Sequence, residues 1–139
     1  MSLSVLDSPL FGPLFATDAM RAVFCERAWL SCALAVETAL ARVQARHGLV
    51  PESLGDALAE IGPDVFDPAA LGAGTALAGV PVIPFLAALR EHLPEAVEPH
   101  LHKGATTQDV VDTVAMLQAR EATDLLLADA LAVLDGLTR

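Results

Sequence analysis

A long helical pattern near the end of the chain, apolar almost all round in its second half, limits the possible folds most. The stretch LLLADALAVL, residues 125–134, follows a region in which Val110, Val114 and Leu117 share one helical face. This periodicity predicts a helix from about Thr107 to Asp135. A helix that is apolar on every side has to be covered on every side, which one short chain does poorly. We therefore expect a larger assembly.

Composition extends the helical prediction to the rest of the chain. Of the 139 residues, 54% are hydrophobic, chiefly Ala and Leu, whereas only 4% are aromatic and Tyr is absent. Ala and Leu are strong helix formers, and runs of β-branched residues are few. The sequence therefore predicts an all-α fold.

The first long helix is expected to start at an N-cap formed by Thr17 or Asp18 and to run to His47, ahead of Gly48 and Pro51. Apolar positions step by three and four residues along one face of this segment of close to thirty residues, as in an amphipathic helix. The positions on that face are Ala22, Cys25, Trp29, Cys32, Val36, Ala39 and Val43.

Shorter elements are expected between the two long helices. Pro and Gly residues delimit helices at 51–62, at 68–78, and from Pro81 or Pro84 to Leu93. Residues 94–104 are expected to form a loop. Residues 1–16 contain two prolines and a glycine, which predicts an extended arm or a short turn.

The charge balance excludes several classes of partner. The net charge is −10, and no basic stripe is present that could neutralise the phosphates of a nucleic acid. No apolar run reaches the roughly 18–20 residues that a membrane span needs. The chain also does not open with a secretory signal pattern. We expect no nucleic-acid partner, no membrane and a cytoplasmic location.

The stretch HLHKGATTQDVVDT, from His100 to Thr113, gathers the polar groups that suit a binding site. It holds the only lysine of the chain, Lys103, beside two of the four histidines. It then leads into the last helix, where Thr106 and Thr107 are N-cap candidates and Thr106 with Asp109 has the spacing of a capping box. A helix N-terminus offers unpaired N–H groups and a positive dipole end. The stretch therefore predicts a site for a small carboxylate or phosphate.

Each of these residues also has a simpler interpretation. His102 could be a loop histidine that only caps a helix or stacks on a neighbour, and the two threonines could be caps and nothing more. Asp109 and Asp112 share a helix face, but first-turn acidic residues are favoured by the helix dipole, so a structural role is preferred to an acid–base pair. His100 and His102 with Asp109 form only a weak metal-ligand pattern.

The same stretch carries a resemblance to a known family. His102 to Asp109, followed by Asp112-Thr113, resembles the first signature region of the fumarase/aspartase superfamily. The form H-x-G-A-T-[ST]-Q-D-x-x-D-T is closest to the 3-carboxy-cis,cis-muconate cycloisomerase branch. Lys103 departs from that branch, where an aromatic residue is common. The chain also resembles this branch in its first long helix and in the segment that follows it. The residues that carry this similarity are Arg21, Glu26, Glu37, Ala41 and the run from Gly48 to Pro51.

The resemblance implies an all-α fold with an N-terminal helical domain, residues 1–105, and the first long helix of a central helix bundle, residues 106–139. Proteins of this family are several hundred residues long and form tetramers through that bundle. The chain is therefore expected to be an N-terminal fragment that lacks the second signature and the catalytic-loop serine, and to be inactive alone. The implied reaction is the lactonising addition of a carboxylate across a double bond, in the protocatechuate branch of aromatic degradation.

The resemblance also implies roles for individual residues. His102 is expected to be catalytic, and the residues expected to bind substrate are Thr106, Thr107, Gln108 and Lys103. The residues expected to shape the site are Gly104, Asp109, Asp112 and Thr113. The resemblance implies a small polycarboxylate substrate and a homo-oligomer, which is a tetramer in the intact form. It implies no metal and no cofactor. Two alternatives stay open, an adenylosuccinate-lyase-like lyase and a non-catalytic helical assembly module.

Overall fold

The computed structural model describes residue 5 and residues 8–139, and these residues form helices and no strand. The α-helices are α1 (Asp18–Val23), α2 (Glu26–Arg46), α3 (Glu52–Ala59), α4 (Pro68–Ala78), α5 (Val82–Arg90) and α6 (Thr107–Thr138). Short 3-10 turns are η2 (Gly12–Leu14), η3 (Pro63–Val65) and η4 (Glu98–His100). The all-α prediction is confirmed. Part of the arm expected at residues 1–16 lies outside the described residues.

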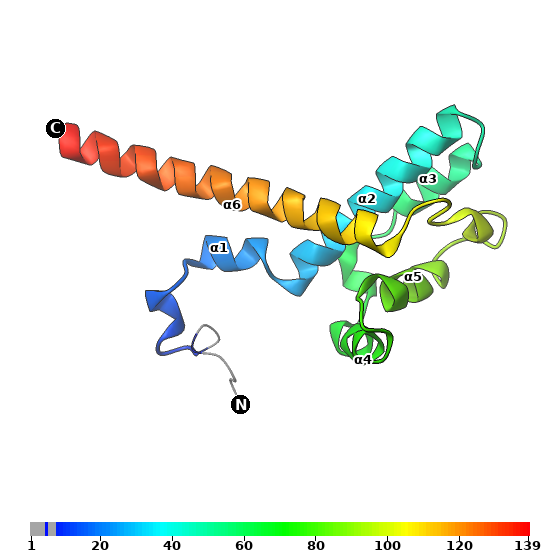
Figure 1. Ribbon diagram of the computed structural model, residues 1–139, viewed down its shortest axis with the longest axis horizontal. Helices are drawn as coiled ribbons and strands as arrows, with labels where there is room; N and C mark the ends of the chain where they lie inside the picture. Colours follow the sequence, from blue (N-terminus) through cyan, green and yellow to red (C-terminus); the bar gives the residue numbers. More distant parts are fainter. Residues whose placement is uncertain (1–4, 6–7) are drawn as a thin grey trace.

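The helices form a small body from which α6 projects (Figure 1). Helices α2 and α3 pack side by side at one end of the body, and α4 and α5 pack together below them. The first half of α6 lies across α1, α2 and α5, whereas its second half extends away from the body to the C-terminus. At 1.5 Å per residue, the 32 residues of α6 measure about 48 Å.

The core lies where α2, α3, α5 and the start of α6 meet. Phe85 of α5 is fully buried at its centre, with the ring of Phe66 at 5.4 Å and the ring of Trp29 at 5.8 Å in an edge-on arrangement. Burying each large apolar side chain contributes about 1.5–3 kcal/mol. The other fully buried large side chains of the core include Leu54, Leu58, Leu89, Val82, Val110 and Val114.

The first long helix differs from its prediction because it is two helices. The chain leaves helical geometry at Phe24 and Cys25, and Cys25 is extended at the start of α2. The carbonyl oxygen of Val23, which ends α1, accepts a hydrogen bond of 2.7 Å from the buried Gln118 side chain of α6. A side chain from α6 thus satisfies a carbonyl that the break leaves without a helical partner.

The predicted apolar face of this segment only partly coincides with the core face, since Trp29, Cys32 and Val36 are half-buried against the core. Ala22, Ala39 and Val43 are exposed, and the buried residues of α2 lie on a neighbouring face. They are Leu30, Ala33, Leu34, Glu37 and Ala41. A glutamate stands in the middle of that face, so the true core side looks interrupted in the sequence. An apolar pattern locates a core face only where every buried residue is apolar.

The shorter helices follow their predictions closely, with α4 at the predicted residues and α5 ending three residues early. The glycine-rich composition of α4 has a packing reason at Gly74. A Cβ atom built there would lie 2.6 Å from the Cβ of Pro84 on α5. The missing side chain therefore lets the two helices approach each other.

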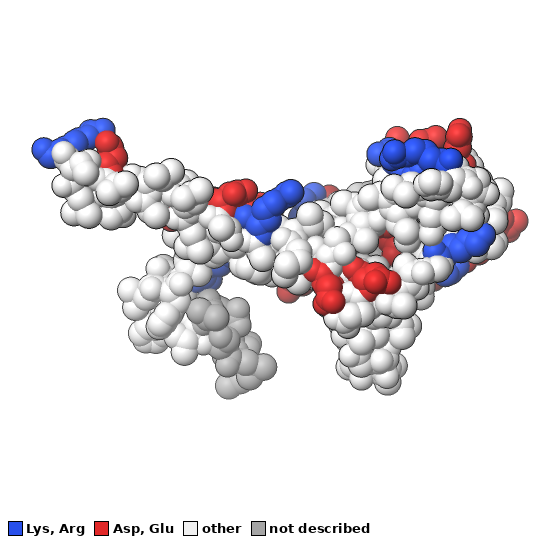
Figure 2. All heavy atoms as spheres, turned by 45° about the horizontal axis from the view of Figure 1, so that its top comes forward, with Lys and Arg blue, Asp and Glu red and all other residues white. Residues whose placement is uncertain are grey.

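The second half of α6 is uncovered, as its apolar pattern predicts for a single chain. Leu126, Leu127, Leu131 and Leu134 are each more than half exposed. Figure 2 shows few charged side chains along this part of the rod, apart from those at its tip. In the part of the chain that the structure describes, no helix is long and apolar enough to span a membrane.

This exposure predicts self-association. Covering each of these leucines contributes about 2 kcal/mol, so at micromolar concentration the chain should sediment as a dimer or a larger species. The double variant Leu131→Gln, Leu134→Gln should shift the distribution toward monomer. The control Leu77→Gln removes the most exposed leucine of α4, at 93% exposure, and should leave the distribution unchanged. A wild-type monomer whose residues 125–134 resist hydrogen exchange would contradict the prediction.

Candidate functional site

The start of α6 is capped as the sequence predicts. The Asp109 carboxylate accepts hydrogen bonds from the Thr106 backbone N–H at 2.7 Å and from the Thr106 hydroxyl at 3.0 Å. These two hydrogen bonds lower the pKa of Asp109 below its usual range, and the nearby His102 lowers it further. Asp109 is therefore ionised at neutral pH and belongs to the cap. Its predicted role in shaping the site stays a prediction.

His102 lies in the turn that precedes the cap, with an unusual backbone conformation. Its φ of 59° makes it the one described non-glycine residue with positive φ, and Gly104 follows with φ 72°. The left-handed region costs a residue with a side chain roughly 1–2 kcal/mol. Such a conformation persists only where the surrounding contacts hold it.

The first of those contacts is a buried carboxylate. Nδ1 of His102 lies 2.7 Å from Oε1 of Glu37 on α2. The Glu37 side chain is 1% exposed and the His102 side chain 14% exposed. The small space around this pair, walled by α2, α3 and residues 100–102, has no room for a water molecule. The carboxylate and the ring are therefore direct partners.

Two further hydrogen bonds hold the same turn, one to the end of α2 and one to the segment that follows it. The Gln44 side chain donates to the Lys103 carbonyl oxygen at 2.6 Å, and the Lys103 ammonium donates to the Leu49 carbonyl oxygen at 2.8 Å. The only lysine of the chain thus holds the turn against the segment that follows α2. Its predicted part in substrate binding stays a prediction.

Arg90 of α5 holds the other end of the loop. Its guanidinium donates to the carboxylate of Glu98 at 2.6 Å and to the Glu98 carbonyl oxygen at 3.2 Å. Burial raises the pKa of Glu37, while the hydrogen bond and charge of His102 and the charge of Arg90 act in the opposite direction. Burial is the largest of these effects, so the pKa of Glu37 lies above its usual range, and the hydrogen bond with His102 and the charge of Arg90 favour the ionised carboxylate against it.

The remaining predicted residues lie along the first turns of α6. The Gln108 amide donates to the Asp112 carboxylate at 2.5 Å, and the Thr113 hydroxyl donates to the Asp109 carbonyl oxygen at 2.6 Å. Thr107 is half-buried at the first position of the helix, and its hydroxyl forms no hydrogen bond within the described part of the chain. Of the three residues expected to bind substrate at the helix start, Thr106, Thr107 and Gln108, only Thr107 makes no side-chain hydrogen bond within the described residues.

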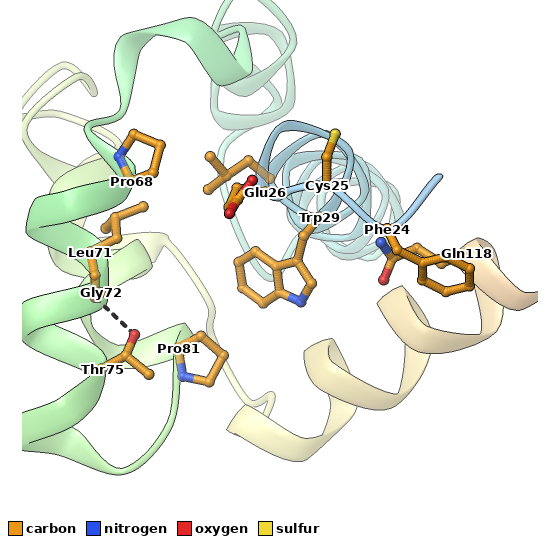
Figure 3. Close-up of a pocket in the computed structure, with 11 residues that line it drawn as sticks. Phe24, Cys25, Glu26, Trp29, Pro68, Leu71, Gly72, Thr75, Pro81 and Gln118 are labelled. Carbon is orange, nitrogen blue, oxygen red and sulfur yellow. Dashed lines mark hydrogen bonds between the residues drawn. The ribbon is translucent and has the colours of Figure 1, made fainter. Parts of the chain in front are cut away.

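A larger hollow, of about 360 Å³, lies elsewhere, between the start of α2, α4 and α6. Figure 3 shows Trp29 in this hollow, with Leu71 and Pro81 on one side and Gln118 on the other. Its lining is mostly apolar, and none of the catalytic, substrate-binding or site-shaping residues predicted from the sequence contributes to it. The predicted residues gather instead at the turn before α6.

Comparison with known proteins agrees with the resemblance. No protein-family model matches the chain. A 3-carboxy-cis,cis-muconate cycloisomerase of Pseudomonas putida is 41% identical over 129 residues, which are 89% of this chain and 30% of that protein. A nitrosuccinate lyase of Streptomyces davaonensis is 39% identical over 131 residues, 91% of this chain and 27% of that protein.

A solved structure agrees as well. The crystal structure of a 3-carboxy-cis,cis-muconate lactonizing enzyme from Pseudomonas putida matches with a TM-score of 0.82 and 42% identity, over 88% of this chain and 29% of that one. The resemblance to the cycloisomerases of the fumarase/aspartase superfamily is confirmed. The chain spans about 30% of the length of the cycloisomerase that it matches.

Sequence reasoning missed the residues that hold the site together. Glu37 entered only as a point of resemblance, and no role was predicted for Gln44 or Arg90. A signal for Glu37 was present, because it has alanines four residues before and after it, at Ala33 and Ala41. A glutamate inside an apolar helical stripe is buried, and a buried carboxylate needs a partner.

Proposed function

We propose that this chain is the N-terminal part of a 3-carboxy-cis,cis-muconate cycloisomerase, and that the turn before α6 forms one wall of its active site. The enzyme would join a substrate carboxylate to a carbon of a double bond within the same molecule, giving a lactone. The support is the match to such enzymes over 89% of this chain, together with the geometry of the turn.

The observation that carries the proposal is the placing of His102 directly before an anion-binding helix start. The ring is held through Nδ1 by Glu37, so Nε2 is the nitrogen left for a substrate. The N–H groups of the first turn of α6 and the positive end of its dipole attract a carboxylate. A protonatable ring beside an anion site suits a reaction on a carboxylated substrate.

The chemistry needs these two features together. Adding a carboxylate oxygen to the double bond leaves negative charge on the neighbouring carbon, in a carbanion-like enolate of an activating carboxylate. That charge must be stabilised, and the carbon must receive a proton. We assign carboxylate binding to Thr106, Thr107 and Gln108, with the helix N–H groups, and assistance in proton transfer to His102.

The anchors differ in what they can offer. The Thr106 hydroxyl donates to Asp109 and the Gln108 amide donates to Asp112, whereas the Thr107 hydroxyl has no such bond within the described residues. We infer that Thr107 provides the main side-chain contact with the substrate. The Lys103 ammonium donates one of its three N–H groups to the Leu49 carbonyl oxygen, and this bond directs the side chain toward the segment after α2.

We also propose a domain organisation, an oligomeric state and a location for the intact enzyme, based on the match to the cycloisomerases. Residues 1–105 form an N-terminal helical domain, and residues 106–139 begin a central bundle whose other helices cover the exposed leucines of α6. The intact enzyme is then a homotetramer in the cytoplasm. The 139 residues alone supply one part of the site and are inactive.

A second candidate is a lyase acting on a smaller dicarboxylate. The 39% identity to a nitrosuccinate lyase over 91% of the chain favours it. A histidine beside an anion-binding helix start serves an elimination as well as an addition, because the two are the same reaction in opposite directions.

The substrate itself tests the proposal. A full-length protein that carries this segment should consume 3-carboxy-cis,cis-muconate, followed by ultraviolet absorbance, at about 1–1,000 turnovers per second. The 139-residue chain should show no enzyme-dependent loss. Consumption of nitrosuccinate but not of the muconate by the full-length protein would favour the second candidate, and turnover by the 139 residues alone would contradict the assignment as one part of a site.

Thr107 provides a sharper test in the full-length protein. Thr107→Ala should lower kcat/KM by about 10- to 150-fold, because a hydrogen bond to a charged group contributes about 1.5–3 kcal/mol. The matched control is Thr123→Ala on the same helix, whose hydroxyl donates to the Ala119 carbonyl oxygen. If both variants melt like the wild type and keep its kcat/KM, Thr107 does not bind substrate.

A further inference from the structure

Glu37 is the one buried carboxylate among the described residues. It reaches the candidate site from α2, 65 positions away from His102 along the chain. A carboxylate in the core without a partner is strongly unfavourable, so a buried glutamate is kept by a specific contact. Here that contact is a ring nitrogen of the histidine assigned to proton transfer.

A histidine has two ring nitrogens, and the hydrogen bond that one of them makes decides which of them carries the proton. A carboxylate only accepts hydrogen bonds, so an ionised Glu37 requires a proton on Nδ1. The neutral ring then has its lone pair on Nε2. The two atoms are 2.7 Å apart and the Glu37 side chain is 1% exposed, so the hydrogen bond is direct and no water molecule lies between the partners.

The charged groups near the pair favour this arrangement. The positive charge of Arg90, on α5, opposes the rise that burial causes in the pKa of Glu37. The Asp109 carboxylate, on α6, is near enough to His102 for the two charges to interact, but its oxygen is occupied by the Thr106 N–H and hydroxyl. Glu37 is therefore the carboxylate that determines the state of the ring.

We propose that Glu37 is the positioning residue of the site: its carboxylate accepts the Nδ1–H of His102, fixes the plane of the ring, and leaves Nε2 as the only nitrogen that can exchange a proton with a substrate. The part of this inference that concerns a substrate rests on the proposed function. The position of the proton on the ring does not depend on it. It also explains why His102 keeps a left-handed backbone, since the hydrogen bond holds the residue there.

The experiment is nitrogen NMR of the 139-residue chain labelled with ¹⁵N-histidine, at about pH 8–9, where an ordinary histidine of pKa about 6.5 is neutral. In the wild type, Nδ1 of His102 should carry the proton. In Glu37→Gln the charge is gone and the amide can donate as well as accept. The ratio of the Nδ1–H to the Nε2–H form should therefore fall about tenfold or more, equivalent to about 1.4 kcal/mol.

The matched control is Glu98→Gln, which removes the carboxylate paired with Arg90 and should leave the ratio unchanged. Circular dichroism establishes that the variants remain helical. A wild-type ring with the proton on Nε2, or an unchanged ratio in a folded Glu37→Gln, would overturn the proposal. No substrate is needed, so a failure of the proposed function in the activity assay would leave this result standing.

Discussion

The contact between Glu37 and His102 is the interaction on which the candidate site depends. Without Glu37 the turn before α6 would keep one side-chain hydrogen bond to α2 and one to Leu49 beyond it, and His102 would lose the partner that holds its ring. Without His102 the buried carboxylate would lack its nearest hydrogen-bond partner, a change that typically costs about 3–5 kcal/mol when one member of a buried pair is removed. Each residue therefore stabilises the other in its position.

This pair also connects the site to the core. Glu37 shares a face of α2 with Ala33, Leu34 and Ala41, which pack in the interior. The histidine belongs to a loop whose other end is fixed by Arg90 of α5. The start of α6 follows within a few residues, with Val110 and Val114 fully buried in the same core. The ring and the helix start are thus held by one packed unit, as a site requires for defined geometry.

The sequence was sufficient for the parts of the fold that depend on local chemistry. Proline and glycine located α3 and α4, and the Thr106–Asp109 spacing located the start of α6. The break at Phe24–Cys25 could not be predicted, because the Val23 carbonyl is satisfied by Gln118, 95 positions away. The core face of α2 was missed for a related reason, since Glu37 makes it look polar until its partner is known.

The candidate site shows the same division between local and distant contacts. The motif placed His102, Thr106 and Thr107 at the turn, and the capping geometry followed from sequence spacing. The partner of Glu37 lies 65 positions away along the chain, and that of Gln44 lies 59 positions away, so only the folded chain brings these two residues to the turn. Arg90 is 8 positions from its partner Glu98. Glu37 carried a local signal of burial, its place in an apolar helical stripe, but that signal does not say which residue is its partner, and Gln44 and Arg90 carried none.

The central claim is that a substrate carboxylate binds at the start of α6 within reach of His102. A crystal structure of the full-length protein with a bound polycarboxylate substrate analogue tests it most directly. We expect one carboxylate on the first-turn N–H groups and the Thr107 hydroxyl, with Nε2 of His102 facing the ligand and Nδ1 still on Glu37. A ligand bound at a site that excludes Thr107 and His102 would contradict the account.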